Sequence, residues 1–194
     1  MKKKIPQSAK VVIIGGGVAG CSAAYHLSKF GWNNIVLLER DQLTSGTTWH
    51  AAGLIGQLGS SATITKLRNY SLNLYKQLEI ETGLSTGLKQ NGSLTVATTE
   101  ERLHELKRQV TTAQLFNVEA NEVSKSQIKS LYPLINTEDI IGGVHIPNDG
   151  QADPVGVTNV LAKAAKQHGA NIIEQCSVKK ILTKNNQIAG VETD

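Results

Sequence analysis

The sequence predicts an α/β fold in which a parallel sheet is interrupted by a second, α+β domain. Apolar, mostly β-branched runs at residues 11–14 and 35–38 flank a glycine-rich turn and a helical pattern. Continuous apolar runs of this kind are typical of parallel strands that are buried on both faces. A third such run follows only at residues 171–174. The long segment before it has helices and strands of its own, which indicates an inserted domain.

The first part of the chain alternates strands and helices around one long loop. After the strand at residues 11–14, small residues followed by Leu27 predict a helix over residues 18–30, which Gly31 ends. The strand at 35–38 leads into a loop over 41–62 that is rich in glycine, threonine and serine. A helix over 63–82 is expected next. Its buried face is predicted to consist of Ile64, Leu67, Ser71, Leu74 and Leu78.

Helix caps mark the elements of the second part. A short strand at 94–97 precedes a capping box formed by Thr98 and Glu101, and a second box pairs Ser124 with Gln127. A strand is expected at 140–146. Asp153 and Pro154 are an N-cap and a first helical residue, and that helix should reach residue 168. The strand at 171–174 and a hairpin of 177–183 with 187–193 complete the order.

Composition excludes several classes of protein. The 194 residues are 40% hydrophobic and 19% charged, as in a globular chain, and no run approaches the roughly 20 apolar residues of a membrane span. The net charge of +4 includes three lysines at positions 2–4, and without them the chain is nearly neutral. No nucleic-acid partner is therefore expected, because such a partner needs basic residues gathered on one face. The basic start lacks a long apolar run or an arginine-rich leader, which favours a cytoplasmic location. Cys21 and Cys176 lack metal-ligand spacing and are expected to be reduced thiols, with no metal site.

The glycine-rich turn predicts a dinucleotide site. Gly15-x-Gly17-x-x-Gly20 stands between strand and helix, where the glycines allow a tight turn, close approach of a pyrophosphate and close helix packing. Glu39 ends the second strand, where a carboxylate accepts both ribose hydroxyls. Its charge argues against a 2′-phosphate, although Arg40 keeps that alternative open. A simple nicotinamide-binding Rossmann domain would place its third strand sooner, so the insertion favours a flavoprotein.

The loop at residues 44–54 is the second candidate site. Its small and hydroxyl-bearing residues allow the backbone to pass close to a flat, polar ligand, and Trp49 and His50 interrupt them with two rings. From the residues alone, His50 is a hydrogen-bonded loop histidine, a general base or a metal ligand without partners. The residues do not decide among these roles.

These segments resemble the sarcosine and dimethylglycine dehydrogenase family, FAD-dependent amine oxidoreductases of the D-amino-acid oxidase-like group. The resemblance is somewhat closer to sarcosine dehydrogenase. It covers nearly all of this chain but only the first part of a family member. The segments that carry it are residues 15–20, 37–40, 44–54, 81–84, 90–92, 131–134, 149–150, 153–154 and 190–193.

The resemblance implies a role for each candidate residue. It places a covalent bond to the flavin 8α-methyl carbon on His50. It assigns the pyrophosphate to Val18 and Ala19, the adenosine ribose to Glu39 and Arg40, and the adenine to Val178. The flavin is assigned to Gly46, Thr47, Thr48, Trp49, His50, Ala51, Ala52, Gly53 and Leu54.

The resemblance also implies domains and a reaction. Residues 1–84 and 151–194 would be parts of a Rossmann-type FAD-binding domain, still incomplete at Asp194, and residues 85–150 the first part of a substrate-binding domain. A small N-methyl amino acid would give a hydride to the flavin, and its one-carbon unit would become formaldehyde or pass to tetrahydrofolate. Because the family's acid–base residues correspond to positions beyond Asp194, no catalytic residue is assigned here. This N-terminal part alone is expected to be inactive.

Several matters stay open at this point. The electron acceptor and the exact N-methyl amine are not fixed by the sequence, and a eukaryotic protein would be expected in the mitochondrial matrix. One alternative is a glycine-oxidase-like amine oxidase, whose relatives generally lack the Trp-His pair. The other is a non-catalytic protein like the regulatory subunit of pyruvate dehydrogenase phosphatase, which departs from the pattern at the flavin-linking histidine.

Overall fold

The computed structural model describes residues 5–194, which divide into two compact units. Unit 1 contains the described residues up to Gly53 together with Tyr75–Gly87 and Asp153–Asp194. Unit 2 contains Leu54–Leu74 and Leu88–Ala152. The boundary at residues 74 and 75 falls inside one long helix, α2 (Ala62–Thr82).

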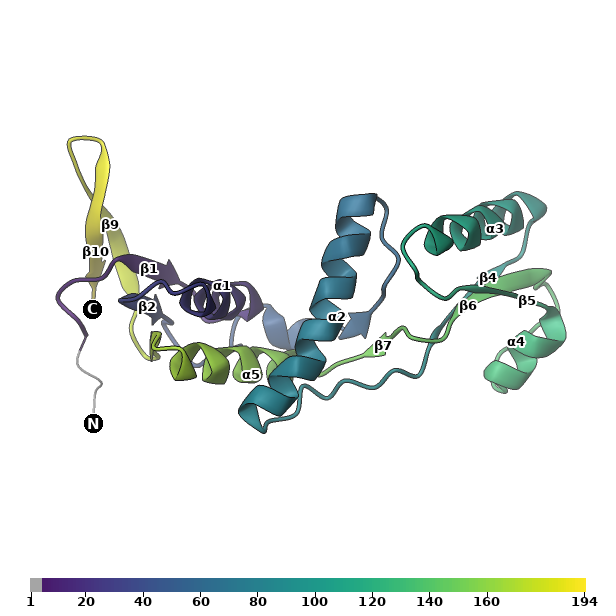
Figure 1. Ribbon diagram of the computed structural model, residues 1–194, viewed down its shortest axis with the longest axis horizontal. Coiled ribbons are helices and arrows are strands. Elements are labelled where there is room, and N and C mark those ends of the chain that lie inside the picture. Colours follow the sequence, from purple (N-terminus) through teal and green to yellow (C-terminus); the bar gives the residue numbers. More distant parts are fainter. Residues whose placement is uncertain (1–4) are drawn as a thin grey trace. The chain divides into compact units, whose positions relative to one another are not determined.

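Unit 1 is built on a parallel sheet of three strands. The order is β1 (Val11–Ile14), β2 (Ile35–Leu38) and β8 (Asn171–Ile173), with β2 in the middle. Of these strands, β1 and β2 are labelled in Figure 1. Both β1 and β8 run parallel to β2. The predicted α/β class is confirmed, including a third strand that joins the sheet after the long intervening segment.

Alternate residues of β2 are buried on opposite faces of this sheet. Val36 and Leu38 join a cluster with Ile173 and Cys176, which Val178 and other hairpin side chains cover. The helices α1 (Val18–Lys29) and α5 (Pro154–Gln167) pack against each other and against the strands. All four residues of β2 are therefore buried.

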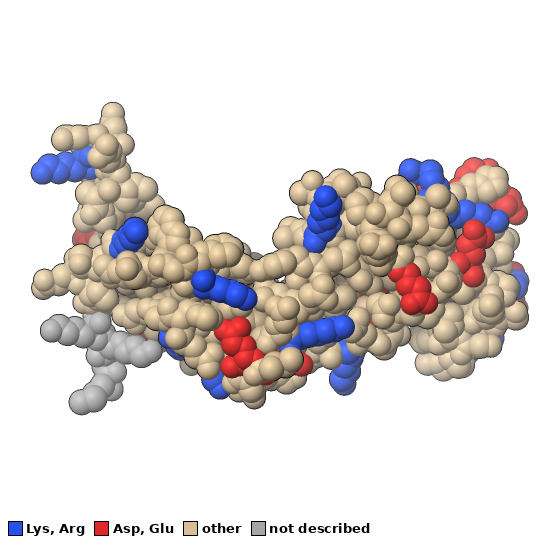
Figure 2. All heavy atoms as spheres, viewed as in Figure 1, with Lys and Arg blue, Asp and Glu red and all other residues tan. Residues whose placement is uncertain are grey.

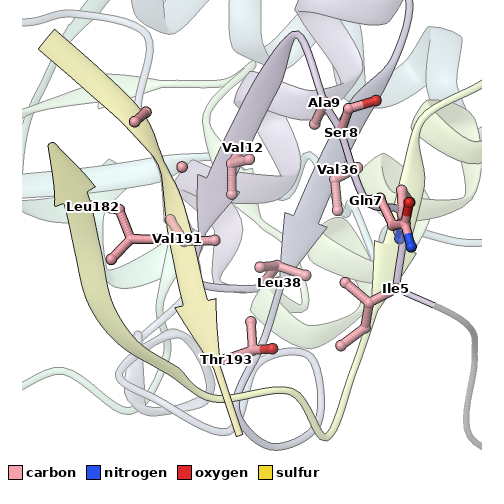
Figure 3. Close-up of a pocket in the computed structure, with 13 residues that line it drawn as sticks. Ile5, Gln7, Ser8, Ala9, Val12, Val36, Leu38, Leu182, Val191 and Thr193 are labelled. Atoms are coloured by element: carbon pink, nitrogen blue, oxygen red, sulfur yellow. The ribbon is translucent and has the colours of Figure 1, made fainter. Parts of the chain in front are cut away.

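A β-hairpin forms the end of the described chain. Its strands are β9 (Val178–Lys184) and β10 (Gln187–Thr193), joined through Asn185 and Asn186 with φ of 52° and 59°. Two successive positive φ angles are the geometry of a two-residue hairpin turn, and asparagine tolerates it well. Figure 3 shows apolar side chains of β1, β2 and the hairpin around a pocket of about 390 Å³.

The prediction that β1 is buried on both faces is wrong. Its first three residues are only partly buried and Ile14 is 52% exposed. The reason is its place in the sheet, because β1 pairs with β2 alone among the described strands. An edge strand has a neighbour on one side only, so its side chains are covered less completely than those of β2.

Unit 2 is an antiparallel sheet with helices packed on it. The strands lie in the order β4 (Ser93–Ala97), β6 (Gly142–Ile146) and β5 (Asn121–Val123). The helix α3 (Glu100–Gln114) packs on β4 and β6 through a cluster that includes Leu106 and Val144. The helix α4 (Lys125–Leu131) adds Ile128 to a second cluster. A small ribbon of β3 (Leu54–Ile55) and β7 (Gly150–Gln151) completes the unit.

Two of the three expected caps are confirmed and one is displaced. Ser124 forms the complete capping box with Gln127, and the Asp153 side chain accepts from the Val155 N–H ahead of α5. The box assigned to Thr98 is wrong, because Thr99 is the N-cap of α3 and accepts from the Arg102 N–H.

The predicted buried face of α2 is only partly right. Leu74 and Leu78 are buried, but Ile64 and Leu67 are 38% and 57% exposed. Thr65 is buried in their place, since its hydroxyl accepts from the Gly59 N–H and donates to the Ser61 carbonyl. A polar contact with the preceding loop thus decides which side of the first turns is covered.

The described part of the chain contains no helix that is long and apolar enough to cross a membrane. Residues 5–194 also contain no group of three or more His, Cys, Asp or Glu side chains able to hold a metal ion. On the face drawn in Figure 2, lysine and arginine side chains are scattered over the surface rather than gathered in one area.

Candidate functional site

The turn between β1 and α1 can be made only with glycines. Gly15 has a φ of +107°, which side-chain-bearing residues rarely adopt, and its N–H donates to the Leu38 carbonyl at 2.9 Å. A Cβ on Gly20 would lie 2.0 Å from the Gly15 oxygen, so α1 packs directly against the turn. A Cβ on Gly16 would lie 2.6 Å from Leu43 Cδ2. The turn is therefore tightly enclosed by its own chain.

The N-terminus of α1 opens beside this turn without a cap from its own segment. Its N-cap residue is Gly17, which makes no side-chain cap bond, and the first turn carries no acidic residue. The first N–H groups of a helix have no partners within the helix, and the helix dipole makes this end electropositive. Such an end favours an anion such as a phosphate.

The Glu39 carboxylate lies directly after β2 and is 8% exposed. Its Oε2 accepts from the Gly16 N–H at 2.6 Å and its Oε1 accepts from the Asp41 N–H at 2.9 Å. Each carboxylate oxygen can accept a further hydrogen bond. The side chain is therefore held by backbone donors while it retains capacity for ligand hydroxyls. The neighbouring Arg40 is exposed.

The loop after β2 is held against the glycine turn. The Thr44 N–H donates to the Gly16 carbonyl at 3.1 Å, and the Leu43 N–H donates to Glu174 Oε1 at 2.9 Å. Thr44 has a φ of +72°, which is an outlier for a β-branched residue. Such strained conformations persist only where the surrounding structure enforces them, and they cluster at functional sites.

A single 3₁₀ turn, η1 (Thr48–His50), carries the two rings. The Trp49 and His50 ring centroids are 3.8 Å apart with an interplanar angle of 47°, and both side chains are exposed. Thr48 is buried, and its Oγ1 accepts from the Val18 N–H at 3.1 Å. The turn is thus attached to the start of α1 while the imidazole points outward.

These parts surround a pocket of about 430 Å³ within unit 1. Eight of the predicted site residues line it: Gly15, Gly17, Glu39, Arg40, Gly46, Thr47, Thr48 and Val178. Five other residues share the lining: Ile14, Leu38, Ser45, Cys176 and Ser177.

The remaining predicted site residues do not line this pocket. Val18 and Ala19 are the exposed first residues of α1, and Gly20 follows them. Trp49, His50 and the residues through Gly53 lie immediately beyond the pocket-lining threonines along the chain. Leu54 begins β3 in unit 2 and is 80% exposed.

Sequence reasoning misses two features of the site. Gly16 does not line the pocket, but its N–H fixes the Glu39 carboxylate that does. Cys176 is brought to the pocket by the bond from its N–H to the Glu39 carbonyl, a contact that spans the inserted segment. Below the turn, Cys21 is fully buried, and burial raises the pKa of its thiol to about 12. It is therefore a packing residue and not a nucleophile.

The lining fits the adenosine diphosphate half of a dinucleotide. One wall offers an electropositive helix end, another a carboxylate with spare acceptor capacity, and the rest small residues and hydroxyls. The helix end suits a pyrophosphate, and the carboxylate suits ribose hydroxyls. The small residues leave space for a flat base. The residues present are thus compatible with FAD.

Comparison with known proteins agrees with this geometry. A family model described as FAD dependent oxidoreductase (DAO) matches residues 10–194. The mitochondrial sarcosine dehydrogenase of Homo sapiens is 44% identical over 98% of this chain. The mitochondrial pyruvate dehydrogenase phosphatase regulatory subunit of Mus musculus is 42% identical over 98%, and the mitochondrial dimethylglycine dehydrogenase of Rattus norvegicus is 40% identical over 95%. The chain spans 22% of the length of each.

The fold has counterparts among solved structures. L-proline dehydrogenase from P. horikoshii superimposes with a TM-score of 0.90 at 30% sequence identity. The match covers 98% of this chain and 50% of that one.

Proposed function

Because the chain belongs to the FAD dependent oxidoreductase family, we propose that it forms the cofactor-binding part of an enzyme that demethylates a small N-methyl amino acid. The proposed substrate is sarcosine, dimethylglycine or a related amine, and the flavin is held covalently by His50. The support comes from the pocket beside the glycine turn, the exposed imidazole next to it, and the similarity to two dehydrogenases of N-methyl amino acids.

The residues that line the pocket and the segments beside it have separate tasks in this proposal. The Glu39 carboxylate accepts the ribose hydroxyls, with Arg40 on the same side, and the backbone at Val178 contacts the adenine. The first residues of α1, Val18 and Ala19, hold the pyrophosphate. The segment from residue 46 to residue 54 lies along the flavin. When bound, FAD supplies a two-electron acceptor for the amine's methyl carbon.

His50 is suited to a covalent role by its place on the chain. Its turn begins with Thr48, which lines the pocket, while its imidazole is exposed. The proposed bond would replace one C–H bond of the flavin methyl group and the imidazole N–H by a C–N bond. The two electrons and two protons released would require an external two-electron oxidant such as dioxygen. The protein's own part is to keep the imidazole in place, and the adjacent Trp49 ring restricts it.

The finer features remain part of the same proposal. The amine must be neutral, and its methyl group must be held over the flavin, for oxidation to proceed. The one-carbon unit would leave as formaldehyde or pass to tetrahydrofolate, and no residue is assigned to either fate. The acceptor of the electrons taken from the substrate is not assigned. A mitochondrial matrix location would apply if the protein is eukaryotic, since the names of several relatives include that organelle.

Overall identity does not separate the enzyme from a regulatory protein. The regulatory subunit is 42% identical and sarcosine dehydrogenase is 44% identical over the same share of the chain. The single observation that favours the enzyme is the presence of His50, because the resemblance implies that the regulatory relative departs at this position.

Acid precipitation of the intact protein tests the covalent bond. We expect flavin absorbance to stay with the precipitated wild-type protein and to be lost to the supernatant in His50→Ala. His104→Ala is the matched control, because this other exposed histidine lies on α3 in unit 2. A colourless wild-type precipitate, or a coloured one from His50→Ala, would show that His50 does not carry the flavin.

A further inference from the structure

Thr48 connects two parts of the site that are far apart in the sequence. Its Oγ1 accepts a hydrogen bond from the Val18 N–H at 3.1 Å, across 30 positions of sequence. Val18 is the first residue of α1, the helix whose N-terminus is expected to hold the pyrophosphate. Thr48 is also the first residue of η1, the turn that ends at His50. One hydroxyl thus joins the proposed phosphate site to the turn that carries the imidazole.

This contact satisfies one of the free N–H groups at the start of α1. A side chain at the N-cap position usually accepts from the second or third N–H of a helix, but Gly17 has no side chain to offer. Thr48 instead reaches the first N–H from another segment, and its Oγ1 lies 2.9 Å from where a Cβ on Gly17 would be. The contact is enclosed, because Thr48 is only 8% exposed.

The hydroxyl has a second capacity that the chain does not use. A threonine hydroxyl accepts through its lone pairs and also donates one proton. Oγ1 accepts from Val18, and no acceptor for its proton is found among residues 5–194. Thr48 also lines the 430 Å³ pocket next to Gly15 and Gly17. An unused donor thus remains at the electropositive end of a helix, in the wall of the pocket.

We propose that Thr48 is a positioning residue that couples the seating of the pyrophosphate to the placement of His50. In this proposal, which rests on the proposed function, its hydroxyl accepts from the Val18 N–H and donates its proton to a pyrophosphate oxygen. A bound phosphate then holds the hydroxyl through two hydrogen bonds, one accepted from the Val18 N–H and one donated to the phosphate. Because Thr48 and His50 are the two ends of one 3₁₀ turn, the imidazole is fixed with it.

A purely structural role for Thr48 makes different predictions. If the hydroxyl only capped α1, its loss would weaken the binding of every ligand of the pocket through the fold. If it donates to a phosphate, the loss falls on ligands that carry a pyrophosphate. Adenosine and ADP share base and ribose and differ in the pyrophosphate, so they separate the two roles.

The first measurement is ligand affinity in the intact protein that carries His50→Ala, so that no covalent bond to the flavin can form. The Thr48 variants are made in this background. Thr48→Val removes the hydroxyl with little change of shape, and Thr48→Ser retains it. We expect Thr48→Val to weaken ADP and FAD binding about tenfold or more, as for one hydrogen bond to a charged group. Adenosine binding should change less than threefold, and Thr48→Ser should restore ADP affinity. Equal losses for ADP and adenosine, or no loss for ADP, would overturn the proposal.

The second measurement is the rate at which acid-stable flavin forms in the intact protein with His50 present, at saturating FAD. We expect Thr48→Val to slow this rate at least tenfold and Thr48→Ser to restore it. An unchanged rate in Thr48→Val, with wild-type protein that does retain flavin, would overturn the coupling and leave the proposed function standing. Wild-type protein that binds neither FAD nor ADP would overturn the proposed function, and this inference with it.

Discussion

Gly20→Ala is the most direct test of how α1 meets the glycine turn. The added Cβ would lie 2.0 Å from the Gly15 oxygen, 3.2 Å from its carbonyl carbon and 3.4 Å from Ile13 Cγ2. Real Cβ atoms essentially never approach closer than 3.0 Å, so the first distance must grow by at least 1 Å. The obstacle is backbone, which cannot rotate away as a flexible side chain would.

The expected cost follows from two opposing effects. Alanine inside a helix is favoured over glycine by about 1 kcal/mol. Forcing extra atoms into a packed region costs typically 1–3 kcal/mol and occasionally more. Because two backbone segments must separate here, we take the upper end of that range. The free energy of unfolding should then fall by about 2 kcal/mol, and FAD affinity should fall with it because the phosphate turn opens.

Urea unfolding of the apoprotein measures this change, and FAD titration measures the effect on binding. Gly46→Ala is the matched control for stability, since a Cβ at Gly46 meets nothing within 4 Å and its φ is not positive. Surface substitutions usually change the free energy of unfolding by no more than about 0.5 kcal/mol. If the free energies of unfolding of Gly20→Ala and Gly46→Ala differ by less than this, the close contact of helix and turn does not exist as described.

Two further predictions concern other buried or bonded carboxylates. In unit 2, Asp149 is 4% exposed and accepts hydrogen bonds from the Gln57 N–H and the Ser93 hydroxyl, each at 2.7 Å. Asp149→Ala should therefore lower the free energy of unfolding by about 2–4 kcal/mol. Asp149→Asn, whose amide can donate to the Ser93 oxygen, should lower it clearly less, and equal losses in the two variants would refute the role of these hydrogen bonds. Hydrogen bonds from Thr86 hold the pKa of Glu79 below its usual value, so their stabilisation is complete above the unfolded pKa of about 4.3 and is lost as pH falls through the lower folded pKa. In Glu79→Gln, the free energy of unfolding should therefore fall less steeply as the pH is lowered through this range. An unchanged pH dependence of the free energy of unfolding would count against a stabilising role for the Glu79 carboxylate.

The elements that local pattern determines were predicted closely. The strands at residues 11–14 and 35–38 were expected within those limits and are found there. The Asp153 cap and the hairpin turn were also expected, because each depends on residues adjacent in the sequence. In all of these cases the deciding interaction spans only a few positions.

Errors arose where several residues could fill one role or where the contact is distant. Thr98 and Thr99 can both cap a helix, and the sequence does not show which of them accepts the N–H three residues on. The strands β3 and β7 are two residues long and exist only because the chain brings residues 54–55 and 150–151 together. No short-range pattern indicates such a pairing. The exposure of β1 likewise depends on its position at the edge of the sheet.

The roles of the glycines could be predicted only in part for the same reason. Gly15 and Gly20 meet the requirements stated from sequence, a tight turn, which Gly15 makes with a positive φ, and a close helix contact. Gly17 was expected to be small so that a pyrophosphate could approach. In the structure, a Cβ at Gly17 would already meet Thr48 Oγ1 at 2.9 Å. The chain's own loop therefore requires a glycine here before any ligand does. A substitution at Gly17 disturbs the loop and the phosphate site together, whereas Thr48→Val keeps every glycine of the turn and removes a single hydroxyl, with the hydrogen bond that it accepts from the Val18 N–H and the proton that it can donate.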